Sequence, residues 1–184
     1  MERIRDKVQR CLILEHLEDK EECLRRVYDK YCNFRRLNLK DAVLRSEHPS
    51  RFAELVDAVS WCSTVSATLA ALKMFPVRDI RFFEDPAEEL YLSSPEDALK
   101  LDKLYAFAMA VGCRDYGSST VVEQNGTRVV FQGHTNAVAK AICGVPLKGI
   151  RVEVSGEHRS PNRRFYVKLG DFLHRRNPYS HTSA

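Results

Sequence analysis

A two-residue turn near the middle of the chain constrains its fold more than any other feature. Asn125-Gly126 is the dipeptide that best tolerates two consecutive positive φ angles, and it separates two stretches rich in β-branched residues, 119–124 and 127–132. The sequence therefore predicts an antiparallel hairpin, which excludes a purely helical fold. Counting outward from the turn gives the facing pairs Gln124 and Thr127, Glu123 and Arg128, Val122 and Val129, Val121 and Val130, and Thr120 and Phe131.

Periodic patterns on both sides of this hairpin predict an α+β fold. Residues 89–92 and 150–155 are typical of short strands, whereas 94–112 and 135–143 carry the apolar spacing of helices that end at a glycine. The resulting order is strand, helix, strand, strand, helix, strand. This βαββαβ order predicts a ferredoxin-like sandwich, in which two helices cover one face of an antiparallel sheet.

The first 76 residues predict a helical region. Apolar residues recur every three or four positions over 4–12 and 24–34, and a longer helix is expected to begin at Pro49. Its expected apolar face consists of Phe52, Leu55, Val56, Val59, Cys62, Leu69 and Leu72. That face belongs either to the core or to an oligomer interface. We therefore expect three segments: a helical region at 1–76, the βαββαβ domain at 77–155 and a C-terminal tail at 156–184.

Length and composition favour a globular intracellular protein. The chain has 184 residues, of which 44% are hydrophobic, so it can bury a sizeable core. Its first residues lack the apolar segment of a signal peptide, and no run approaches the roughly 20 apolar residues of a membrane span. We expect a cytoplasmic or nuclear location and no membrane partner.

The six cysteines are expected to be buried, reduced thiols. They are widely spaced, contain no Cys-x-x-Cys pair and stand near no histidine at metal-site spacing. A chain of this length with an adequate core needs no disulfide framework. No metal site is therefore predicted.

The net charge of the chain is concentrated at its C-terminal end. Residues 156–184 hold six basic and two acidic side chains, whereas residues 1–155 hold 23 of each, so the whole net charge of +4 lies in the tail. Clustered lysine and arginine neutralise phosphates and release counterions, which indicates an anionic partner. The alternative is a solvated tail that only aids solubility.

Within this tail, residues 159–168 combine cations with two adjacent aromatic side chains. Cations anchor phosphates and aromatic rings stack on unpaired bases, so the segment predicts an RNA contact. Its candidate residues are Arg159, Arg163, Arg164, Phe165, Tyr166 and Lys168. The same segment is compatible with an extra strand at 165–169 and a final helical turn at 170–176, with the arginines as a rim.

Residues 89–155 resemble an RNA-recognition motif. Leu90-Tyr-Leu-Ser93 is similar to the family's short first-strand motif, and Val129-Val-Phe131 and 136–154 are similar to its third strand, second helix and last strand. The resemblance implies RNA binding on an open sheet face, where aromatic residues of the family stack on bases. The expected open face consists of Tyr91, Val121, Glu123, Arg128, Val130, Arg151 and Glu153.

The chain departs from that family in its stacking positions. With Phe131 as the core-facing residue of the third-strand motif, the two stacking positions fall on Gly126 and Arg128, and neither is aromatic. Tyr91 keeps a stacking position, and Arg128 and Arg151 supply charge. Since a stacked base contributes about 1–3 kcal/mol, this face is either a degenerate RNA site or a protein-binding face.

Three functions are open at this point. The first is a non-catalytic RNA-binding or ribonucleoprotein-assembly protein, and the second is an interaction module that binds a protein partner or itself, through the sheet face or the helical region. Residues 90–120 are also similar to part of the methyltransferases that act late in wybutosine synthesis on tRNA, which implies a tRNA-modifying enzyme. That family's Ser- and Cys-rich N-terminal motif has no counterpart here.

No phosphate loop, nucleophile elbow or carboxylate pair indicates catalysis, so no catalytic residue and no cofactor are predicted.

Overall fold

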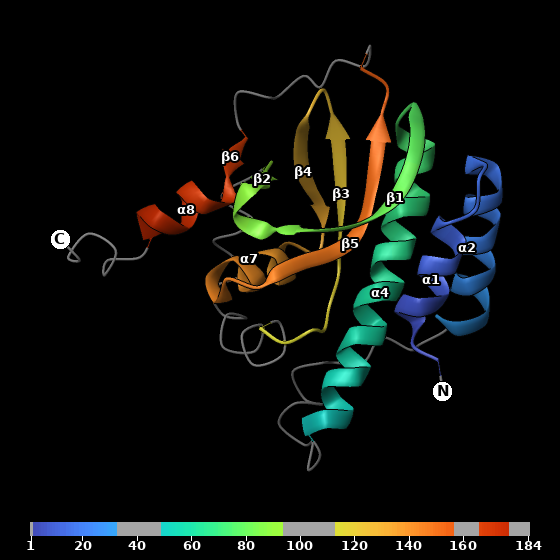
Figure 1. Cartoon of the computed structure of the whole chain (residues 1–184), viewed down its shortest axis with the longest axis horizontal. Helices are drawn as coiled ribbons and strands as arrows, with labels where there is room; N and C mark the ends of the chain where they lie inside the picture. The colour runs from blue at the N-terminus through green and yellow to red at the C-terminus, as the bar shows by residue number, and fades with distance from the viewer. Residues whose placement is uncertain (1, 33–48, 94–112, 157–165, 177–184) are drawn as a thin grey trace.

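A mixed sheet flanked by helices forms the centre of the molecule (Figure 1). The structure is a computed structural model that describes residues 2–32, 49–93, 113–156 and 166–176. Within these residues the sheet has six strands in the order β1-β5-β3-β4-β2-β6. The chain is therefore α+β with N-terminal helices, as the sequence predicts.

The elements follow one another along the chain with these bounds. The strands are β1 (Val77–Pro86), β2 (Tyr91–Leu92), β3 (Ser119–Gln124), β4 (Thr127–Gln132), β5 (Pro146–Val154) and β6 (Val167–Lys168). The helices are α1 (Ile4–Leu12), α2 (Leu17–Tyr31), α4 (Pro49–Met74), the 3₁₀ helix η1 (Ala87–Glu89), α7 (His134–Cys143) and α8 (Leu169–Arg176). The helix expected at 94–112 lies outside the described residues.

The sheet is mixed, which corrects the antiparallel arrangement expected from the sequence. β3 is parallel to β5 and β2 is parallel to β4, whereas the remaining neighbours are antiparallel. A ferredoxin-like sheet would place the strand at 89–92 between β5 and β4, but β3 occupies that place and β2 lies outside β4. The reason is strand length, because β3 pairs with β5 over Ser119–Glu123, whereas β2 has two residues with which to compete for that place.

The hairpin forms where the turn predicts it. Asn125 and Gly126 have φ angles of 51° and 78°, as a two-residue turn of this kind requires. The four facing pairs nearest the turn have the expected register, including Glu123 opposite Arg128. This part of the sequence prediction is confirmed.

The fifth expected pair of the hairpin is wrong, because a β-bulge shifts the register there. Thr120 lies opposite Gln132 rather than Phe131, because the register shifts by one residue between Thr120 and Val121. The Thr120 hydroxyl donates to the Thr64 carbonyl of α4 at 3.1 Å. Contact with α4 therefore helps to hold the shifted register in place.

The N-terminal helices cover one face of the sheet. Val8, Cys11 and Leu24 of α1 and α2 are fully buried and pack in one cluster with residues of α4, β1 and β5. In that cluster the Trp61 ring stacks on Phe82 of β1, with ring centroids 6.1 Å apart. The helical region is thus part of the core rather than a separate unit beside the sheet.

The buried face of α4 differs from the expected one. Its buried residues are Ala53, Asp57, Trp61, Cys62, Thr64, Val65, Thr68 and Ala71. Of the residues expected to face inward, Cys62 is buried, Leu69 and Leu72 are half-buried against the core cluster, and Leu55, Val56 and Val59 are half-buried. The reason is that Asp57 and Thr64 of the buried face find partners in the loop before β3: the Gly117 N–H donates to Asp57, and the Ser118 hydroxyl lies 2.6 Å from that of Thr64.

The opposite face carries a second apolar cluster. Ala137 and Val138 of α7 pack there with Leu147 of β5 and with two residues of the β6–α8 segment, Leu169 and Phe172. Val121 and Val130 are also members of this cluster and are almost completely buried. Both were expected on an open sheet face, so that expectation is wrong: helices lie on both faces of this sheet.

All six cysteines are paired in disulfides, which corrects the expectation of reduced thiols. The pairs are Cys11–Cys23, Cys32–Cys62 and Cys113–Cys143. Folding brings together cysteines that are far apart in sequence, for example by placing α1 against α2, so sequence spacing could not reveal them. Disulfides are most common in oxidising compartments and also occur in intracellular proteins of hyperthermophiles. The intracellular location stays a prediction.

By length and composition, residues Ala53–Met74 of α4 are apolar enough to cross a membrane. The core helix of a soluble protein has the same properties, and α4 packs against the sheet through Trp61 and Val65.

Candidate functional site

The two arginines expected to contact RNA on the sheet face are both neutralised by carboxylates. Arg128 on β4 forms an ion pair with Asp85 at the end of β1. Arg151 on β5 lies 3.0 Å from Glu123 and 3.2 Å from Glu153. A phosphate would have to displace these carboxylates, so this face is a poor platform for a polyanion.

Tyr91 points to the other side of the sheet from these arginines. Its neighbour Leu92 pairs with Val130 and is buried among the same side chains, and successive residues of a strand alternate between faces. Tyr91 pairs in register with Lys168 of β6, which is exposed. The structure therefore separates Tyr91 from Arg128 and places it beside Lys168 instead.

The candidate residues that the structure brings together lie at the end of the sheet opposite β1. We define Tyr91, Tyr166 and Lys168 as the β2–β6 edge; both tyrosines are half-buried. The other candidates of the tail, Arg159, Arg163, Arg164 and Phe165, lie outside the described residues. Of the two interpretations of the tail, the strand followed by a helix is confirmed for Val167–Arg176, because Leu169 and Phe172 are buried against the sheet.

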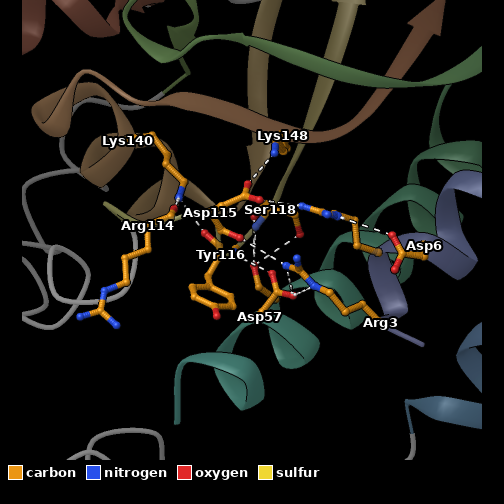
Figure 2. A network of polar contacts seen from close by, with 12 residues as sticks. Arg3, Asp6, Asp57, Arg114, Asp115, Tyr116, Ser118, Lys140 and Lys148 are labelled. Carbon is orange, nitrogen blue, oxygen red and sulfur yellow. Dashed lines mark hydrogen bonds and ion pairs between the residues drawn. The ribbon is translucent and has the colours of Figure 1, made fainter. Parts of the chain in front are cut away.

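A polar cluster that the sequence patterns do not predict joins the N-terminal helices to the loop before β3 (Figure 2). It consists of Arg3, Arg5, Asp57, Asp115, Lys140 and Lys148. Asp57 is 4% exposed and accepts hydrogen bonds from Arg3 Nη2 at 2.7 Å and from the Gly117 N–H at 2.9 Å. Partial burial lowers the pKa of Arg3, but the hydrogen bond and the charge of Asp57 outweigh this, so the pKa is raised.

Asp115 receives the remaining charged contacts of the polar cluster. Arg5 Nη1 donates to its carboxylate at 3.1 Å, and Lys148 of β5 donates to the other carboxylate oxygen. Partial burial raises the pKa of Asp115, but the hydrogen bonds from Lys148 and Arg5 prevail and lower it. One loop carboxylate thus connects α1 with β5.

Lys140 of α7 holds the same loop from its other side. Its side chain is buried, and its ammonium donates to the backbone carbonyls of Arg114 and Tyr116, the latter at 2.7 Å. Burial lowers its pKa to about 8, against the opposing charges of Asp115 and Asp57. A lysine with a lowered pKa is the kind of amine that acts as a nucleophile or base, but here its hydrogen bonds position the loop.

In the wild type the free energy of unfolding should rise with pH in the alkaline range, and Lys140→Met is expected to remove this rise. In the folded protein Lys140 has a pKa of about 8, against 10.5 for an unperturbed lysine. Between these two values the unfolded chain binds more protons than the folded one, so the free energy of unfolding increases with pH, by on the order of 2 kcal/mol. Urea unfolding followed between about pH 8 and pH 10 measures this slope.

The exposed Lys168→Met serves as the matched control and should keep the wild-type slope. If the free energy of unfolding changed equally with pH in the wild type and in Lys140→Met, the lowered pKa of Lys140 would be contradicted, whatever the absolute stability of the variant.

A signal for the polar cluster was present in the sequence. Asp57 and Lys140 are charged residues set among the apolar positions of two helices, and a charge that is buried with such a face requires a partner. The partners themselves could not be inferred, because they come from a loop and a helix that are distant in sequence.

No group of three or more His, Cys, Asp or Glu side chains that could hold a metal ion is found in the part of the chain that the structure describes. Comparisons with protein-family models, with curated proteins and with solved structures find no match to this chain.

Proposed function

We propose that this protein is a non-catalytic RNA-binding or ribonucleoprotein-assembly protein that contacts unpaired RNA at the β2–β6 edge. The observation that carries the proposal is the register of β2 and β6, in which the exposed Lys168 lies beside Tyr91. A cation next to an aromatic ring can hold a phosphate while the ring stacks on the adjoining base.

The distribution of charge supports the same edge. All of the net charge of +4 resides in residues 156–184, and β6 and α8 anchor part of that segment on the sheet. Arg164 is four residues before Lys168, so chain length alone keeps the two within about 14 Å. The basic segment and the edge can therefore bind one RNA strand together.

The proposal assigns little affinity to the sheet face. Arg128 and Arg151 are paired with carboxylates, and the buried Val121 and Val130 leave no room there for bases. The resemblance of residues 89–155 to an RNA-recognition motif is a further argument for RNA as the partner. Because the sheet is mixed, the RNA is assigned to the edge rather than to the face that the family uses.

Replacing Arg159, Arg163 and Arg164 together by alanine is expected to weaken RNA binding and to flatten its dependence on salt. Each phosphate contact on a single strand contributes about 0.7 to the slope of log K against log salt, so three lost contacts reduce the slope by about 2. Fluorescence anisotropy with a labelled, mixed-sequence single-stranded RNA over a salt titration provides the measurement.

The matched control replaces Arg10, Arg25 and Arg26 by alanine, which removes the same charge from α1 and α2. These arginines are exposed and paired with Glu2, Glu21 and Glu22. Both the affinity and the slope should stay near the wild-type values. An equal loss in the two variants would mean that only overall charge matters, and absence of RNA binding in the wild type would end the proposal.

A further inference from the structure

The outer edge of β1 is partly unprotected. Among the described residues, β1 is the first strand of the sheet and pairs with β5 on one side only. Ile80 donates its N–H to the Asp79 carboxylate at 2.9 Å and accepts from Lys20 Nζ at 3.1 Å, so the even-numbered residues of β1 direct their backbone groups away from β5. By this alternation the N–H and C=O groups of Phe82 and Glu84 also face outward, and among the described residues no partner is found for them.

The protection that Lys20 provides ends at Ile80. Lys20 is buried, and its ammonium is shared between the Ile80 carbonyl and the Asp79 carboxylate, 2.8 Å away. A charged side chain over an edge is a common way to prevent another strand from pairing with it. From Phe82 to Glu84 this device is absent in the part of the chain that is described.

A hollow of about 630 Å³ opens beside the same stretch of β1. Phe82 and Lys20 line it, together with Ile13 and Leu14 from the turn between α1 and α2. Ile13 is 80% exposed and Leu14 is 40% exposed, which is unusual for aliphatic side chains next to a hollow. The edge therefore combines unpaired backbone groups with uncovered apolar surface.

The charges along β1 are complementary to those of a second β1 in antiparallel orientation. A two-fold axis at Phe83 would place the outward groups of Phe82 opposite those of Glu84 from the other copy. The same register would place Arg81, whose side chain is 59% exposed, opposite Asp85 of the other copy, and would do so twice by symmetry. Within its own chain Arg81 contacts Asp79 and Glu153, and Asp85 is paired with Arg128, so each new contact would extend an existing ion pair. Pro86 has no N–H, so the pairing would end where the free backbone groups end.

We propose that two copies of this chain associate through the outer edges of their β1 strands, antiparallel and centred on Phe83. The side chains of Glu84 and Pro86 from each copy lie on the face that carries the hollow of the other. There the proline ring covers part of the exposed surface of Ile13 and Leu14. This interface lies at the opposite edge of the sheet from the β2–β6 edge and is independent of the proposed RNA contact.

Sedimentation velocity of the full chain without RNA, at concentrations up to about 100 μM, tests the proposal, since a micromolar interface is then mostly occupied. The wild type should be a dimer. Arg81→Glu should raise the dimer dissociation constant about tenfold or more, because at both symmetric contacts it replaces a cation by a carboxylate that faces Asp85 of the other copy. Glu84→Pro should have a similar effect, because it removes an N–H that only the second copy can use.

Arg78→Glu is the matched control: Arg78 is an exposed arginine of the same strand, 75% exposed, but it lies outside the paired stretch. It should dimerise like the wild type. Circular dichroism confirms that each variant is folded. A monomeric wild type, or Arg81→Glu and Glu84→Pro chains that dimerise with wild-type affinity, would overturn the proposal.

Discussion

Gly149→Ala is expected to lower the free energy of unfolding by about 4 kcal/mol, beyond the usual 1–3 kcal/mol of an overpacked site. Gly149 lies in β5 directly beside Ser119 of the parallel strand β3. A Cβ atom at this position would overlap the Ser119 carbonyl oxygen and lie 2.8 Å from the carbonyl carbon. These are backbone atoms of a paired strand, so they can yield only if the two strands separate.

Chemical denaturation of the variant, followed by circular dichroism, measures this loss. Gly144→Ala is the control, since a Cβ there meets nothing within 4 Å. Gly144 has a φ of 66°, so alanine at this position should cost about 1 kcal/mol through backbone strain alone. If the two variants lost the same stability, the close approach of β5 and β3 would not be the cause.

Asp57→Ala is expected to lower the free energy of unfolding by about 3 kcal/mol, since the carboxylate is buried but its partner Arg3 is 35% exposed and can be solvated. The change removes the partner of Arg3 and leaves the Gly117 N–H without its acceptor. Both losses act at the same junction of α1, α4 and the loop before β3. Asp57→Asn can still accept from Gly117, so it should retain part of the stability.

Thermal and urea unfolding of these variants are compared with those of Glu54→Ala. Glu54 is an exposed carboxylate about one turn earlier in α4, and its loss should change stability by less than about 0.5 kcal/mol. A similarly small effect of Asp57→Ala would show that the polar cluster contributes little to the fold.

The hairpin is the part of the fold that the sequence predicted in most detail. Its turn depends on the backbone preferences of Asn125 and Gly126, which are adjacent in the chain. The end of α7 was predicted for the same reason, because Gly144 adopts a φ of 66° directly after the helix. Such local preferences need no knowledge of distant segments.

The orientation of α4 shows where this reasoning ends. An aliphatic face was expected to be buried, but the helix turns Asp57, Thr64 and Thr68 inward instead. A polar residue can be buried at little cost when it finds hydrogen-bond partners. Thr68 donates to the Thr64 carbonyl of its own helix, but the partners of Asp57 and Thr64 lie in the loop before β3, more than 50 residues away in the chain. Hydrophobic periodicity records the side chains of one helix and carries no information about such partners.

The candidate RNA residues were divided by the same kind of long-range effect. Tyr91 and Arg128 were expected to share a face, but the parallel pairing of β2 with β4 places them on opposite sides. Lys168 was predicted as a member of the tail, and only the pairing of β6 with β2 places it next to Tyr91.

By itself, the sequence determined the α+β class, the helical start of the chain, the hairpin and its turn, and the concentration of positive charge in the last 29 residues. The tertiary structure decided the strand order, the three disulfides, the polar cluster and the free edge of β1. The physical reason is that turns and helix ends depend on the φ and ψ preferences of neighbouring residues, whereas strand order depends on which distant segments bury the most surface together. The longer β3 outcompetes the two-residue β2 for the place between β5 and β4, and that competition takes place only in the folded chain.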